Sequence, residues 1–183
     1  MKRIITLWAL VLIMATASAQ SIVGKWKSDI IEGLPNDGRG VFEWTFMPDG
    51  KAYQTVRVVN KVIDGVDYRK TVKAQGFYIL EGGKALTFNF DREKTTVKLE
   101  LYYDELFLAE KGISGEPLNI LKKRLNSSLE PSNPAYQRTE QQCKSVIMPS
   151  ALVQILYNDG NKIVYANPRL GFWKTRNELY RIK

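Results

Sequence analysis

The sequence predicts a mainly β chain that closes into an antiparallel up-and-down barrel, with a helical insertion near residues 112–150. Three observations predict this. Short segments between residues 40 and 110 alternate apolar and polar side chains, and turn residues separate them at even spacing. The spacing then becomes helical, and strand character returns at Ala151. Closure into a barrel is expected because it removes exposed strand edges.

The first nineteen residues have the composition of a cleavable export signal. Lys2 and Arg3 precede an apolar run over residues 4–14, and Ala17-Ser18-Ala19 offers a small-x-small cleavage site. The run is shorter than the roughly 20 apolar residues that a bilayer span requires. We therefore expect cleavage after Ala19, one domain over residues 20–183 and a location in the periplasm or outside the cell. Without a cysteine at the cleavage site, and without a later membrane-spanning run, neither a lipoprotein nor a membrane anchor is expected.

The first strands of the barrel are predicted from alternation around a tight turn. Residues 41–47 place Phe42, Trp44 and Phe46 on one face, and Pro48-Asp49-Gly50 supplies the turn into a strand over residues 51–60. The same reasoning predicts the further strands of the meander, over residues 68–74, 76–80, 86–90, 95–103 and 106–109.

The insertion is predicted as helical because four leucines recur at helical spacing: Leu118, Leu121, Leu125 and Leu129. Prolines at 131 and 134 should end this helix, and residues 135–146 are expected to form a second, polar helix. Strands then resume over residues 152–157 and 162–165, on either side of the turn sequence Asn158-Asp159-Gly160-Asn161. A last hairpin is expected from residues 171–175 and 178–182.

The residue types that are missing argue against an enzyme. The chain has no histidine, which removes the usual general base and the commonest transition-metal ligand. Only a carboxylate or tyrosine inside the barrel, such as Glu43 or Tyr78, could act, and no spacing marks a carboxylate pair. We expect no enzymatic activity, no metal site and no cofactor. The single cysteine, Cys143, excludes an intramolecular disulfide and is expected to be a small buried residue.

The net charge of +8 is concentrated in the last third of the chain. Residues 20–110 carry 13 basic against 14 acidic residues, whereas residues 111–183 carry 12 against 5. The densest run is Lys122, Lys123 and Arg124. Such a surface attracts anionic partners, and in an exported protein a lipid headgroup or a glycan is expected rather than nucleic acid.

Three short motifs resemble the lipocalin-like exported proteins of bacteria, a calycin-type barrel family. They are Gly24-Lys25-Trp26, the Phe42-x-Trp44-x-Phe46 strand that leads into Asp49-Gly50, and Gly76-Phe77-Tyr78 with Leu86-Thr87-Phe88. The resemblance covers residues 22–110. It implies an eight-stranded barrel, with Trp26 packed against an arginine of the last strand, for which Arg181 is the first candidate and Arg176 the second. A guanidinium over an indole contributes about 0.5–2 kcal/mol.

Two functions remain open at this point. The first is a binding protein for a small, largely apolar ligand inside the barrel. Its predicted lining is Phe42, Trp44, Phe46, Phe88, Phe90, Leu99 and Leu101. The same side chains would equally form a filled core without a cavity. The second is a non-enzymatic structural or interaction protein of the cell envelope, which would use the basic surface within residues 111–183.

Overall fold

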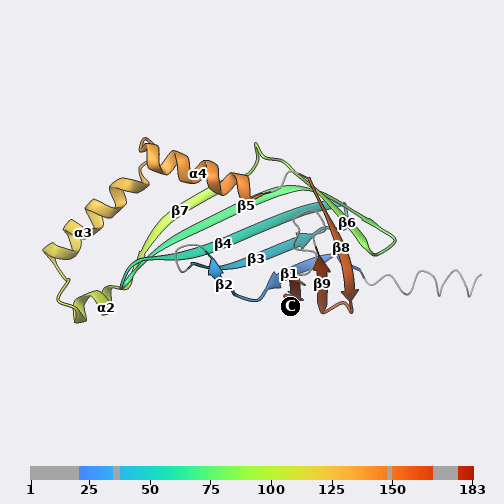
Figure 1. Cartoon of the computed structure of the whole chain (residues 1–183), viewed down its shortest axis with the longest axis horizontal. Helices are drawn as coiled ribbons and strands as arrows, with labels where there is room; N and C mark the ends of the chain where they lie inside the picture. Colours follow the sequence, from blue (N-terminus) through green and yellow to red (C-terminus); the bar gives the residue numbers. More distant parts are fainter. Residues whose placement is uncertain (1–20, 35–37, 148–149, 167–176) are drawn as a thin grey trace, which may run out of the picture.

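A computed structural model describes residues 21–34, 38–147, 150–166 and 177–183 (Figure 1). These residues contain ten strands, three α-helices and one short 3-10 turn. The strands are β1 (Gly24–Ser28), β2 (Ile31–Leu34), β3 (Gly38–Phe46), β4 (Lys51–Ile63), β5 (Val66–Glu81), β6 (Ala85–Phe90), β7 (Thr96–Tyr103), β8 (Ser150–Asn158), β9 (Lys162–Ala166) and β10 (Asn177–Arg181). The helices are α2 (Glu105–Glu110), α3 (Glu116–Asn126) and α4 (Pro134–Val146), and the 3-10 turn is η1 (Ser127–Leu129).

Eight of the strands form a closed antiparallel barrel. Their order around the ring is β1, β10, β9, β8, β6, β5, β4 and β3. β1 closes the ring because it pairs with β10 on one side and with β3 on the other. The predicted fold class is therefore confirmed: a mainly β chain with an antiparallel barrel and a helical segment.

β5 joins the barrel to an extended sheet. From Val66 to Phe77 it pairs with β4, whereas on its other side it pairs first with β7 and then with β6. The separate strands expected over residues 68–74 and 76–80 were wrong, because β5 is one continuous strand of 16 residues. β7 consequently lies outside the ring, on the extension that β4 and β5 carry beyond the barrel.

α4 lies alongside β7 and β5 of this extended sheet, and α2 and α3 lie at its far end (Figure 1). The predicted helical insertion is confirmed by α3 and α4. The strand expected over residues 106–109 was wrong, because these residues belong to α2. Asp104 starts this helix: its side chain accepts a hydrogen bond from the backbone N–H of Phe107 at 3.1 Å. Such a cap satisfies an N–H group that the helix cannot bond itself, and it outweighs the short strand-like alternation that follows.

Two apolar clusters hold these layers together. The main cluster lies inside the barrel and continues beneath α4, where Cys143 and Ile147 are buried against it. The smaller cluster joins the far end of the sheet to α2 and α3 through Val66, Leu108 and Leu118. Cys143 is a free, buried thiol, as expected, and burial raises its pKa.

The turn predicted at residues 158–161 connects β8 to β9. Asp159 shapes it, since its Oδ1 accepts hydrogen bonds from the backbone N–H groups of Asn161 at 2.8 Å and Lys162 at 2.7 Å. The export signal over residues 1–19 and the strand expected over residues 171–175 lie outside the described residues.

Candidate functional site

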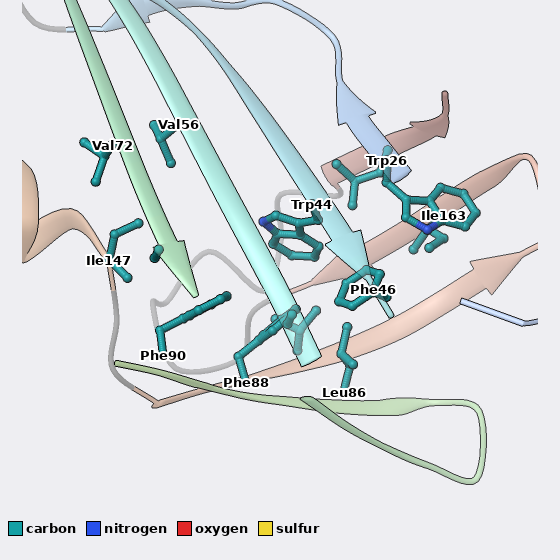
Figure 2. Packing of buried hydrophobic residues seen from close by; sticks show 14 of the residues in the cluster. Trp26, Trp44, Phe46, Val56, Val72, Leu86, Phe88, Phe90, Ile147 and Ile163 are labelled. Carbon is teal, nitrogen blue, oxygen red and sulfur yellow. The ribbon is translucent and has the colours of Figure 1, made fainter. Parts of the chain in front are cut away.

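The interior of the barrel is rich in aromatic rings (Figure 2). Trp44 occupies the centre, with its ring centroid 4.8 Å from that of Phe88 and 5.0 Å from that of Tyr165. Phe46 and Phe90 extend the group through Phe88, at 5.8 Å and 5.4 Å. These residues come from β3, β6 and β9, so strands distant in sequence build one aromatic wall.

Alternation in the strands explains why these rings point inward. In β3 and β6, every second residue is buried, which places Trp44, Phe46, Phe88 and Phe90 on the inner face. Six of the seven predicted lining residues belong to the main cluster or, like Phe42, pack against it, but Leu99 lies on β7, outside the ring. Leu101 lies elsewhere, in the smaller cluster beneath α2 and α3.

Trp44 carries the most informative polar atom of this site. The residue is 7% exposed, and its indole Nε1–H has no hydrogen-bond acceptor among the described residues. Leaving a buried donor unsatisfied costs about 1–3 kcal/mol. Native structures seldom leave such donors unpaired, so we expect an acceptor for this N–H outside the described residues.

Tyr165 is a neighbour of Trp44 that the sequence reasoning missed. Burial raises its pKa to about 12, so its hydroxyl remains neutral and can donate a hydrogen bond at physiological pH. Strand alternation could have identified Tyr165 as facing the interior. It lies two residues after Ile163, which is buried, within a predicted strand. The site thus combines apolar ring faces with the indole donor of Trp44, an arrangement suited to an apolar molecule with an acceptor atom.

A second arrangement closes one end of the barrel. The guanidinium carbon of Arg181 lies 4.6 Å from the ring centroid of Trp26, as the resemblance implied. Arg181 also donates to the backbone carbonyls of Val23 at 3.2 Å, Ser21 at 3.0 Å and Gly160. The Arg181 side chain therefore contacts the segment before β1, the β8–β9 turn and the indole of Trp26.

Gly24 makes room for this arginine. Its φ of 135° disfavours other residues, and an added Cβ would lie 3.0 Å from Nη1 of Arg181. Two residues later, the fully buried Trp26 donates from Nε1 to the carbonyl of Ile22 at 2.7 Å. The Gly-x-Trp spacing thus buries the ring of Trp26 and leaves space above it for the guanidinium of Arg181.

The predicted basic cluster lies on α3, away from the barrel interior. Lys122 is engaged within the protein, because its ammonium lies 2.5 Å from Glu105 and 5.5 Å from the ring centroid of Tyr103. Lys123 and Arg124 are exposed at the end of the helix and have no ion pair within the described part of the chain. Only these two cations of the run are therefore presented to a partner.

The two side chains considered for catalysis have other contacts. Glu43 forms an ion pair with Arg57. Tyr78 packs edge-on against Phe46 at 5.0 Å and donates from its hydroxyl to the carbonyl of Met47 at 3.0 Å. Within residues 21–34, 38–147, 150–166 and 177–183, no group of three or more metal-ligating side chains gathers.

Comparison with protein-family models and with curated protein sequences finds no match to this chain. None of the helices in the described ranges combines the length and the apolar character that crossing a membrane would demand.

Proposed function

We propose that this protein is an exported, lipocalin-like binding protein that holds a small, largely apolar ligand inside its barrel and performs no catalysis. The observation that carries the proposal is the buried indole N–H of Trp44, which lacks an acceptor among the described residues. A ligand acceptor there would satisfy this donor, while the rings of Phe46 and Phe88 would contact the apolar part. The Gly-x-Trp motif and the Trp26–Arg181 contact support the lipocalin-like assignment. The signal-like N-terminus supports a location in the periplasm or outside the cell.

Native mass spectrometry tests this proposal directly. The protein, purified from its own host without detergent, should carry a species of defined extra mass that organic solvent releases. A correctly folded protein that is empty under these conditions would instead indicate a barrel filled by its own side chains.

The substitution Trp44→Phe separates the hydrogen bond from the aromatic wall. We expect the variant to bind the co-purified species with an affinity about tenfold lower, since one hydrogen bond contributes about 0.5–1.5 kcal/mol. The bound fraction measures this change. Trp26→Phe is the matched control, because its indole N–H already bonds to Ile22 within the protein. Equal loss in both variants would show that the effect arises from stability rather than from a ligand contact.

A second candidate function is suggested by the exposed end of α3. Lys123 and Arg124 are free to contact an anionic envelope component, such as a lipid headgroup or a glycan. We expect the double variant Lys123→Glu/Arg124→Glu to lose binding to vesicles of phosphatidylglycerol and phosphatidylcholine. Salt should also abolish that binding, because exposed charges are screened within about 10 Å at 0.1 M salt.

The control for this experiment reverses two charges elsewhere. Lys25→Glu/Lys27→Glu changes the same net charge at two exposed positions of β1. If both double variants lose binding equally, the interaction depends on net charge and not on α3. Lys122 is left unchanged, since replacing it would also break its pair with Glu105.

A further inference from the structure

The outside of the barrel carries a groove that is separate from the aromatic interior. It has a volume of about 410 Å³ and lies over β4, β5 and β6. We call it the outer groove. It is lined by Lys51, Tyr53, Gln75, Gly76, Phe77, Asn89, Asp91 and Lys94. The strand register explains this grouping, because Lys51 and Asn89 lie opposite Phe77, and Tyr53 lies opposite Gln75. Ala52 and Ala74, which alternate with these residues, are buried and face the interior.

The walls of the outer groove are held in place by close backbone contacts. At Gly76, an added Cβ would lie 2.0 Å from the carbonyl oxygen of Asn89, so β5 and β6 approach each other unusually closely. The following loop is fastened to β5, because the backbone N–H of Asp91 donates to the carbonyl of Gln75 at 2.9 Å. Thr95 is buried and bonds back to the carbonyl of Asp91 at 2.9 Å. The groove is therefore preformed.

Two aromatic rings stand exposed in the outer groove. Tyr53 is 40% exposed and Phe77 is 60% exposed. They are diagonal neighbours on adjacent strands, a spacing at which aromatic side chains lie within reach of each other. Exposed rings side by side offer a flat apolar platform to a ligand.

The polar side chains of the outer groove include two uncommitted amides. Gln75 and Asn89 are exposed, and neither side chain forms a hydrogen bond with the part of the protein that the structure describes. Each amide offers both donors and an acceptor, so the pair can bond to hydroxyl groups in either sense.

The charges of the outer groove are already balanced. The ammonium of Lys51 lies 2.5 Å from Asp49, and that of Lys94 lies 3.2 Å from Asp91. A nucleic-acid strand also stacks on aromatic rings, but its affinity depends on cations that neutralise phosphates. Because both lysines are paired, the groove favours a neutral polar ligand.

We propose that the outer groove binds a neutral oligosaccharide. A pyranose ring has an apolar face of C–H groups, which can stack on Tyr53 and Phe77, and hydroxyl groups, which can bond to Gln75 and Asn89. The groove is open to solvent, so a sugar chain can pass through it. This site does not depend on the barrel interior and would remain if the proposed apolar ligand did not exist.

The experiment uses saturation-transfer NMR on the purified protein. The probes are cellohexaose, maltohexaose, mannohexaose and chitohexaose, with decathymidylate as the competing polymer. We expect at least one sugar to receive saturation at its ring protons, and the double variant Tyr53→Ala/Phe77→Ala to weaken its affinity by at least about tenfold, as expected from losing two aromatic contacts.

The matched control is Ile79→Ala. Ile79 is 61% exposed on the same strand and face as Phe77, but it does not line the outer groove, so sugar binding should be unchanged. Trp44→Phe should also leave sugar binding unchanged, which separates this site from the barrel interior. The proposal is overturned if none of the four sugars binds, if decathymidylate binds in their place, or if the double variant binds as well as the unchanged protein.

Discussion

Trp26→Ala is expected to lower the free energy of unfolding by about 4 kcal/mol, in the middle of the range for a buried aromatic residue. Trp26 is fully buried, and the guanidinium of Arg181 covers its ring at 4.6 Å. Removing the indole leaves a cavity and deprives Arg181 of its stacking partner. The pairing of β1 with β10 would then keep its backbone hydrogen bonds and those of Arg181 to nearby carbonyls, but it would lose the buried ring that packs beneath them. Denaturation in urea, followed by far-ultraviolet circular dichroism, measures the change.

Two further variants make this prediction specific. Trp26→Phe retains a ring beneath Arg181 but loses the bond to Ile22, so its effect should be about half as large. Ile182→Ala changes an exposed residue next to Arg181 and should stay within about 0.5 kcal/mol of the unchanged protein. A loss below about 1 kcal/mol for Trp26→Ala would contradict the role assigned to this contact.

Gly76→Ala is expected to lower the free energy of unfolding by about 3 kcal/mol, the upper end of the usual cost of overpacking, or to prevent folding. The new Cβ would lie 2.0 Å from the carbonyl oxygen of Asn89 and 2.7 Å from the Cα of Phe90. Both are backbone atoms, so rotation of a side chain cannot relieve the clash. β6 would have to move away from β5 at the point where Gly76 pairs with Phe90. Urea denaturation again provides the measurement.

Gly83→Ala is the control for this substitution. Gly83 has a φ of 68°, and an added Cβ would meet nothing within 4 Å. Its cost should be limited to backbone strain, about 1–2 kcal/mol. Equal effects at the two glycines would mean that the approach of β6 to Gly76 is not rigid.

Much of the fold could be predicted because strand formation leaves a local signature. The alternation of Phe42, Trp44 and Phe46 predicted both a strand and its inward face, and the Asp159-Gly160 turn predicted a hairpin. Helical spacing of the leucines likewise identified α3. Over a few residues this signal becomes ambiguous. At residues 106–109, the helix cap from Asp104 decided the outcome against the alternation.

The candidate site was predictable only in part, for a related reason. Alternation identified Trp44 and Phe88 as facing one side, but which strands meet across the barrel depends on pairing between distant segments. Tyr165 joins Trp44, whereas Leu101 faces α2 and α3, because β7 pairs beyond the ring.

The sequence by itself determined most of the strands, the helical insertion, the apolar face of strands such as β3, and the Gly-x-Trp opening of the barrel. These properties follow from periodicity and backbone preference over a few neighbouring residues. Only the tertiary structure decided that β7 leaves the ring, that Lys122 is paired while Lys123 is exposed, and that Tyr53 and Phe77 share an outer groove. Such contacts depend on the register and curvature of strands that meet only in the folded chain. The sequence pattern of one strand is the same whichever strand pairs with it.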